Sequence, residues 1–224
     1  MMTVTHAGTR TEDRAEQAPR AGRGVTRRLV AGMAGLALAA AAVYAQTFTL
    51  PYEQRGSALT YQGRIGGTVE TSRFSVKVTS VTSARAVDTT DLGNKTVKVG
   101  TSNLFLLVDV SATTPSEPMQ LSELTPPVLL TADGRRYQPT DKVDKTLTLF
   151  NKWIQPGFWS AGLLVFEVPK DAIPGARLVF VPPDSLMVSD SFAPEAQIDL
   201  GLSGATATRL VSQPEDFHSL TGKS

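Results

Sequence analysis

The stretch FNKWIQPGFWSAGLLVFEVP, residues 150–169, has the pattern that decides the fold. It contains both tryptophans of the chain, three of its nine phenylalanines and the strongest apolar run outside the N-terminal region. Pro156-Gly157 is a turn signal, and the run from Ser160 to Val168 follows it directly. The stretch therefore predicts a turn that leads into a core β-strand.

A hydrophobic period of two residues extends this prediction along the chain. In residues 73–81, Phe74, Val76 and Val78 alternate with polar residues, as expected of a half-buried strand. Residues 103–110 are apolar on nearly both faces, which is typical of a central strand, and Asp133-Gly134 predicts a hairpin. Further strands are expected at residues 84–87, 96–99, 128–131, 147–150, 176–181 and 197–202.

Short strands, turn signals about every ten residues and no clear amphipathic helix predict an all-β fold. We expect an antiparallel β-sandwich of about seven to nine strands over residues 63–202. Residues 203–224 are rich in Ser, Thr and Gly, and they are expected to form a flexible C-terminal tail.

The N-terminal part of the chain has a different composition. Residues 1–28 carry six Arg against three acidic residues and have no apolar periodicity, which predicts a disordered basic tail. Residues 29–50 are uncharged and mostly apolar, long enough for a transmembrane helix across about 30 Å of hydrocarbon. The arginines place the N-terminus in the cytoplasm and the rest of the chain outside it. Residues 51–62 are expected to be a linker, because residues 53–68, which overlap them, are Gly-rich and polar.

A cleaved signal sequence is the alternative for this segment. Val43-Tyr44-Ala45 is a small-residue cleavage site, and cleavage after Ala45 would release a secreted domain that starts at Gln46. We favour the uncleaved anchor, because the region before the apolar run is longer than in most signal sequences. Both alternatives place the domain outside the cytoplasm.

The composition excludes several functional classes. The chain has no Cys, so thiol catalysis, thiolate metal sites and disulfides are ruled out. Its two histidines, His6 and His218, leave little for a metal site or a catalytic triad, and no cofactor is expected. Beyond residue 28 the net charge is −2 with scattered cations, which argues against nucleic-acid binding.

One set of motifs resembles a known family. The pattern P-G-x4-G-x3-F-E-V-P starts at Pro156, and it is preceded by Asp133-Gly134-x-x-Tyr137 and by LLVDV at residues 106–110. Together they resemble a bacterial family of extracytoplasmic immunoglobulin-like domains of unknown function. The resemblance implies an immunoglobulin-like sandwich, tethered by a lipid or one transmembrane helix or secreted, with no assigned reaction. Two departures are Ser111-Ala112-Thr113, where an Asn often follows the central strand, and the lack of a lipidation Cys.

Three polar groups have spacings that could support chemistry. Ser160 lies in a sequence similar to a nucleophile elbow, but the Gly expected two residues before it is Phe158. Asp88, Asp91 and Asn94 offer oxygen ligands for Ca²⁺ without the spacing of an EF-hand, so a turn is favoured. The carboxylates of Asp141, Asp144 and Glu167 are interspersed with lysines, as on a solvated surface. We therefore expect no catalytic residue and no metal site, and an envelope polymer hydrolase is the less favoured alternative.

Trp153, Phe158 and Trp159 form the aromatic cluster best suited to be a binding platform. Packing in the core is the favoured interpretation of these three side chains, because each lies beside a strand that must bury something, and Trp153 is the residue expected to be exposed if one of them is. The sequence thus predicts a non-enzymatic, single-pass membrane-anchored domain of the bacterial envelope. Its expected partners are the membrane, through Leu29 to Leu50, and another envelope protein or a cell-wall component.

Overall fold

In a computed structural model of the chain, the structure describes residues 58–91, 93–183 and 193–221, together with 32–35, 38 and 41. The chain divides into two compact units, residues 1–51 and 52–224. The described residues of the first unit are helical and exposed. The predicted tail 1–28 and most of the predicted transmembrane segment 29–50 lie outside the described residues. No helix in the described part of the chain has the length and apolar character needed to cross a membrane.

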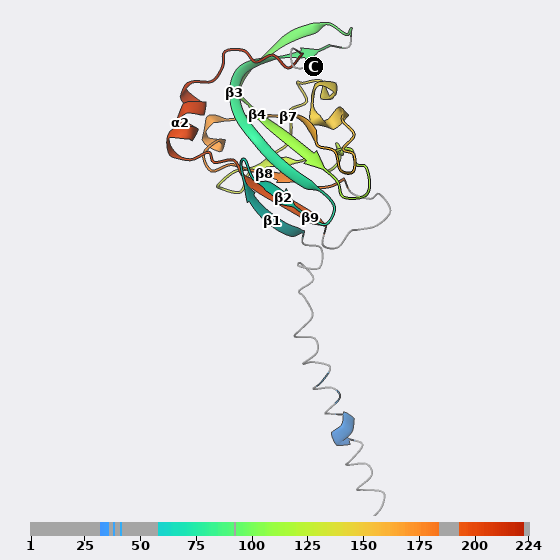
Figure 1. Ribbon diagram of the computed structural model, residues 1–224. Helices are drawn as coiled ribbons and strands as arrows, with labels where there is room; N and C mark the ends of the chain where they lie inside the picture. The colour runs from blue at the N-terminus through green and yellow to red at the C-terminus, as the bar shows by residue number, and fades with distance from the viewer. Residues whose placement is uncertain are drawn as a thin grey trace, which may run out of the picture. The chain divides into compact units, whose positions relative to one another are not determined.

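The described strands of the second unit form two facing sheets (Figure 1). The five-stranded sheet has the order β1 (Leu59–Arg64), β9 (Pro194–Asp199), β8 (Arg177–Phe180), β5 (Val128–Leu130) and β6 (Arg136–Tyr137). The four-stranded sheet has the order β2 (Thr68–Glu70), β3 (Ser75–Thr90), β4 (Thr96–Thr113) and β7 (Ser160–Val168). Neighbours pair antiparallel except β1 and β9, which are parallel. The predicted all-β sandwich is confirmed.

The main core lies between the two sheets and follows the predicted alternation. Phe74, Val76 and Val78 are fully buried, and the ring centroid of Phe74 lies 5.2 Å from that of Phe180 in the opposite sheet. Burial of each such side chain contributes about 1.5–3 kcal/mol. Apolar contact between the sheets therefore holds the sandwich together without any disulfide.

Strand β4 is buried on both faces, as its continuous apolar sequence predicts. Leu104, Leu106 and Val108 face the main core, whereas Phe105 and Leu107 belong to a second, smaller cluster. That outer cluster also contains Val165 from β7 of the same sheet, and Val143 and Leu220 from segments that cover the sheet from outside. The sheet thus needs a cover on its outer face, and part of that cover comes from the C-terminus.

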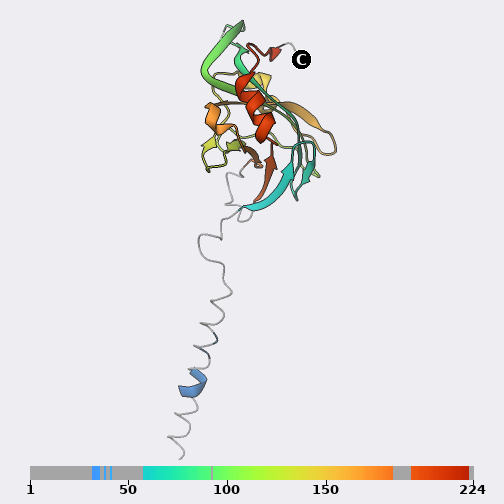
Figure 2. The same ribbon diagram turned by 90° about the vertical axis from the view of Figure 1, so that its left-hand side faces the viewer.

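The prediction of a flexible tail at residues 203–224 is wrong for the described part. Residues Gly204–Ser212 form helix α2, which lies against the outside of the sandwich beside β3 (Figure 2). Leu210 packs into the main core, and its backbone oxygen accepts a hydrogen bond of 2.6 Å from Ser83 Oγ. Most of the surface of this helix is exposed, so a few apolar contacts hold it against the sandwich.

Residues 213–221, which we name the C-terminal strap, pair with the free edge of β3 (Figure 1). Arg85 N–H donates to Glu215 O, Glu215 N–H to Ser83 O, and His218 N–H to Ala86 O, at 2.8–3.0 Å. Pairing of this kind satisfies backbone groups that an uncovered edge strand would leave open. The strap then places Leu220 in the outer cluster.

Two other local predictions need correction. Residues 145–151 form two short 3₁₀ helices, η2 (Lys145–Leu147) and η3 (Leu149–Asn151), instead of a strand at 147–150. The Asp144 carboxylate accepts from Thr146 N–H and the Thr148 hydroxyl from Phe150 N–H, so local side-chain caps favour the helical turns. Residues 59–62 of the predicted linker belong to β1, because β9 provides a partner that local sequence does not reveal.

Candidate binding surface

The segment that runs from the end of η3 to the first residue of β7, residues 152–160, is named the aromatic loop because it carries both tryptophans and Phe158. Its turn has Pro156 at the second position and Gly157 at the third. Phe158 N–H donates to Gln155 O at 3.3 Å, and Gly157 has a φ of 76°. This is the geometry of a type II turn, which requires a positive φ at its third residue and so favours Gly there.

The aromatic loop is fixed to the segment that follows β4. Ile154, which is fully buried, exchanges two backbone hydrogen bonds with Met119, of 2.8 and 3.0 Å. Gly157 N–H donates to Thr114 O at 3.1 Å, and Ser160 Oγ donates to Trp153 O at 2.9 Å across the loop. The backbone is therefore held at both ends and at the turn.

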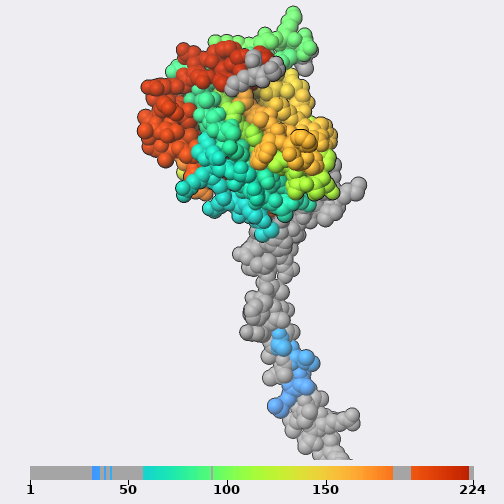
Figure 3. Space-filling model, in the orientation of Figure 1, coloured from blue at the N-terminus to red at the C-terminus, as the bar shows by residue number. Residues whose placement is uncertain are grey.

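The three predicted aromatic residues all project into solvent. Trp153 is 57% exposed, Phe158 74% and Trp159 50%. The yellow-to-orange part of the surface in Figure 3, which includes this loop, lies at the outside of the domain. The core-packing interpretation is wrong for these side chains, because the buried anchor of the loop is Ile154 between them. Three large apolar side chains exposed within seven residues of a fixed loop are of the kind that marks interaction sites.

Ser160 has a structural partner. Its hydroxyl donates to the backbone oxygen of Trp153. The histidine that the structure describes, His218, does not pair with Ser160: it lies in the C-terminal strap, with its Nδ1 2.6 Å from Glu215 Oε2. The nucleophile elbow is not formed, because residues 157–160 are a turn followed by the first residue of β7 and not a strand-to-helix turn.

Of the three carboxylates, Asp144 and Glu167 also have structural roles, whereas Asp141 is exposed. Asp144 caps η2, and a carboxylate oxygen of Glu167 lies 2.7 Å from Lys142 Nζ. Burial raises the pKa of Glu167, but hydrogen bonds from Lys142 and Thr101 outweigh it and hold that pKa below its usual value. Glu167 is therefore ionised at neutral pH, as expected for an ion-paired group and unlike a general acid.

The residues considered for Ca²⁺ are divided between two roles. Asp91 accepts from Gly93 N–H and Lys95 N–H at 2.9 and 2.8 Å, and Asn94 has a φ of 60°, so both build the turn of the β3–β4 hairpin. Asp88 instead binds the C-terminal strap. In the described part of the chain, no three His, Asp or Glu residues are arranged to hold a metal ion. The role of Asp88 was missed because its partners are more than 130 residues away.

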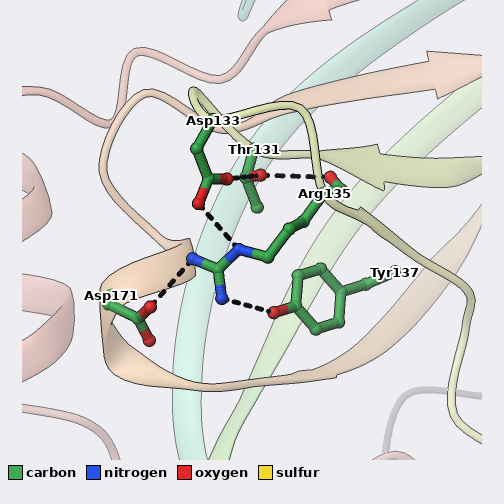
Figure 4. A network of polar contacts seen from close by, with 5 residues as sticks. All are labelled: Thr131, Asp133, Arg135, Tyr137 and Asp171. Atoms are coloured by element: carbon green, nitrogen blue, oxygen red, sulfur yellow. Dashed lines mark hydrogen bonds and ion pairs between the residues drawn. The ribbon is translucent and has the colours of Figure 1, made fainter.

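A polar network fixes the β5–β6 hairpin to helix η4 (Lys170–Ala172), as Figure 4 shows. Arg135 donates to Asp133, to Asp171 and to Tyr137 Oη, at 2.8, 2.8 and 3.0 Å. Hydrogen bonds from Thr131 and Arg135 lower the pKa of Asp133, and Asp171 and Asp133 raise that of Arg135. The charged groups are well exposed, so the network orients the turn without adding much stability.

Fold and surface together define a β-sandwich domain that presents an aromatic loop. The chain belongs to the family defined by the domain of unknown function DUF4352, whose pattern matches residues 63–190. This confirms the family resemblance. In the motif P-G-x4-G-x3-F-E-V-P, which starts at Pro156, Gly157 makes the turn and Gly162 packs against η3. Phe166 and Val168 are core residues, so folding explains these four positions of the motif.

The chain is also similar to solved structures. One is the yjhA protein from Bacillus subtilis, with 17% identity, a TM-score of 0.45 and coverage of 61% of this chain and 99% of that one. Another is the secreted protein MPT63 from Mycobacterium tuberculosis, with 15% identity, a TM-score of 0.44 and coverage of 64% and 99%. No curated protein sequence matches this chain.

Proposed function

We propose that this protein is a non-enzymatic binding domain of the bacterial envelope, and that the aromatic loop contacts its partner, another envelope protein or a cell-wall component. The observation that carries the proposal is the exposure of Trp153, Phe158 and Trp159 on a backbone that is pinned by Ile154 and closed by a type II turn. A preorganised loop loses little entropy on binding, and tryptophan is enriched among the residues that dominate binding energy.

We also infer that the sandwich is immunoglobulin-like. The order β9-β8-β5-β6 corresponds to a G-F-C sheet with an added C′ strand, and β7 pairs with β4 in the opposite sheet as strand E pairs with B. Domains of this kind present loops at the ends of the sandwich for recognition. The aromatic loop is one such connection.

The location is proposed from the sequence of the N-terminal segment. Residues 29–50 anchor the chain in the membrane once, with residues 1–28 in the cytoplasm and the sandwich outside it. The uncharged stretch is long enough to span, and the six preceding arginines favour this orientation.

The absence of Cys allows a direct test of this topology. Single-cysteine variants Thr11→Cys and Ser116→Cys are treated in intact cells with a maleimide that does not cross membranes. Ser116→Cys, at an exposed position of the domain, is expected to be labelled, whereas Thr11→Cys is labelled only after lysis. Protection of Ser116→Cys in intact cells contradicts the proposed orientation, and a mature chain that starts at Gln46 contradicts the anchor.

The two tryptophans make the aromatic loop its own reporter of binding, since the chain has no others. Full-length protein is titrated with purified cell-wall sacculi and, separately, with solubilised envelope proteins, while tryptophan emission and co-sedimentation or co-purification are followed. We expect a blue shift of the emission on binding. A Trp153→Ala/Phe158→Ala/Trp159→Ala variant, followed by co-sedimentation or co-purification alone, is expected to bind about 30-fold more weakly or worse, as for truncation of interface hot spots.

Leu124→Ala is the matched control for this experiment. Leu124 is 79% exposed and lies outside the aromatic loop, so its truncation is expected to leave binding unchanged. Equal binding by the triple variant and the wild type overturns the assignment of this loop.

A further inference from the structure

A polar hollow lies on the outer face of the five-stranded sheet. The aromatic loop leads into β7, which belongs to the other, four-stranded sheet. Its volume is about 270 Å³. Strands β1, β9 and β8 supply its lining, which consists of Gln62, Gly63, Arg64, Arg177, Gln197 and Asp199. The lining contains two guanidinium groups, two primary amides and one carboxylate.

Strand register explains why these groups meet. Asp199 of β9 is aligned with Arg64 of β1 on one side and with Arg177 of β8 on the other, so the three side chains share one face of the sheet. Gln62 and Gln197 are aligned two residues earlier and lie on the same face. Neighbouring strands are about 4.8 Å apart, which places the backbones of the two arginines roughly 10 Å from each other, within reach of one small ligand.

The positive charge of the hollow is only partly neutralised internally, because its lining has two guanidinium groups and one carboxylate. Within the described residues, neither the Arg64 nor the Arg177 guanidinium has a hydrogen bond or an ion pair. In the part of the chain that the structure describes, the Asp199 carboxylate between them forms no ion pair with either guanidinium, and its Oδ1 accepts a hydrogen bond of 2.8 Å from Gly201 N–H. Two arginines thus flank one carboxylate, which leaves both guanidinium forks available to a ligand.

The amides add a second kind of recognition. Gln197 Nε2 donates to Glu195 Oε1 at 2.7 Å, which fixes the amide group of Gln197 and leaves its oxygen as an acceptor. Gln62 has both a donor and an acceptor on an exposed side chain. Amide and carboxylate groups of this kind pair well with hydroxyl groups, whereas guanidinium forks pair with carboxylate and phosphate oxygens.

We propose that this hollow is a binding site for a small hydroxylated ligand that carries one anionic group, such as a sugar acid or a sugar phosphate. Arg64 and Arg177 bind the anionic group. The oxygen of the Gln197 amide and the free oxygen of Asp199 accept hydrogen bonds from ligand hydroxyls, and the Gln62 amide donates to them or accepts from them. The site uses none of the residues of the aromatic loop, so a test of this site is independent of a test of the proposed function.

Ligand-observed saturation-transfer NMR with full-length protein tests this site, because it detects weak binding. The probes are D-glucuronate, glucose 6-phosphate, neutral D-glucose and, by competition, inorganic phosphate. We expect saturable binding of glucuronate and glucose 6-phosphate and no detectable binding of D-glucose. Inorganic phosphate is expected to displace either ligand only weakly, because it lacks the hydroxyl contacts. An Arg64→Gln/Arg177→Gln variant is expected to weaken binding about tenfold or more, from the loss of charge-assisted hydrogen bonds.

Arg136→Gln provides the control, because Arg136 lies on the same sheet in strand β6 but does not line the hollow. It is expected to bind as the wild type does, and unchanged urea midpoints for both variants show that the fold is retained. Three outcomes overturn the proposal: no binding of either anionic sugar, equal binding of D-glucose, or an equal loss in Arg136→Gln. If inorganic phosphate, measured by competition, binds as tightly as glucose 6-phosphate, the assignment of hydroxyl contacts is overturned.

Discussion

Replacing Asp88 with Ala is expected to lower the free energy of unfolding by about 3 kcal/mol, because its carboxylate holds the C-terminal strap through charge-assisted hydrogen bonds. Asp88 is 4% exposed. It accepts from Ser219 Oγ at 2.8 Å, from Thr221 N–H at 3.3 Å and from Thr221 Oγ1 at 2.6 Å, and also from Leu220 N–H. Urea unfolding of the full-length protein measures the loss, and faster amide exchange at residues 215–221 locates it.

The effect of Asp88 depends on pH in a defined direction. Burial raises its pKa, but the hydrogen bonds from Thr221, Leu220 and Ser219 outweigh burial and leave the pKa below its ordinary value of 3.8. Between the folded and the unfolded pKa the unfolded chain binds more protons, so stability rises with pH there. The contribution is thus complete above about pH 4 and is lost as pH falls through the folded pKa. We expect the difference in stability between wild type and Asp88→Asn to shrink below about pH 4.

Asp216→Ala is the control for the strap. Asp216 lies in the same segment and pairs with Arg85 at 3.7 Å, but its side chain is 96% exposed, so its loss should change stability by about 0.5 kcal/mol or less. If Asp88→Ala and Asp216→Ala have equal effects, Asp88 does not hold the strap.

Gly162→Ala is expected to destabilise the domain by about 2–3 kcal/mol, because β7 and helix η3 are in backbone contact at this point. A Cβ on Gly162 would lie 2.9 Å from Leu149 Cα and 3.1 Å from Leu149 N. Those atoms belong to the main chain of η3 and cannot move without shifting the helix. A shift of η3 also disturbs the start of the aromatic loop, so tryptophan emission should change together with the urea midpoint.

Gly100→Ala tests whether steric conflict is the cause. Gly100 lies in β4 of the same sheet, and a Cβ there would approach Arg85 O at 3.9 Å, an ordinary contact. Its effect should be close to zero or slightly stabilising, since Ala restricts the unfolded chain. A stable Gly162→Ala variant would show that η3 adjusts freely, contrary to the packing described above.

The strands could be predicted where burial of one face, or of both faces, leaves a local pattern of apolar residues in the sequence. Phe74, Val76 and Val78 alternate with polar residues, and the continuous run 104–108 marks a strand with two buried faces. Residues 59–62 of β1 fall in the predicted linker, because the strand is nearly all exposed and its partner β9 is distant in sequence. Pairing between remote segments leaves little local pattern, so such edge strands escape a reading of periodicity.

Helix α2 and the C-terminal strap were missed for a related reason. The helix sequence GATATRLVS has few large apolar residues; Leu210 is buried in the main core and Val211 packs against it. The strap is polar except for Phe217 and Leu220, and its order comes from the edge of β3 and from Asp88. Tertiary contacts here override local composition.

The aromatic loop shows what sequence can say about a surface. Trp153, Phe158 and Trp159 were identified as the aromatic cluster, and the Pro-Gly turn between them was correct. Whether they face the core or solvent depends on Ile154, which takes the buried position because its backbone pairs with Met119. That pairing joins the segment after β4 to the aromatic loop before β7. The two segments are close because β4 and β7 are paired in the sheet, which neither loop sequence shows by itself.

The parallel pairing of β1 with β9 has a consequence for the order in which the domain is made. Thr60 and Glu195 are 135 residues apart, so β1 emerges from the ribosome roughly ten seconds before its partner at ordinary synthesis rates. Until then β1 has no neighbour in its sheet, and β8 has an open edge toward the missing β9. The domain therefore closes only once nearly the whole chain exists, and its folding belongs to the slow class dominated by non-local contacts.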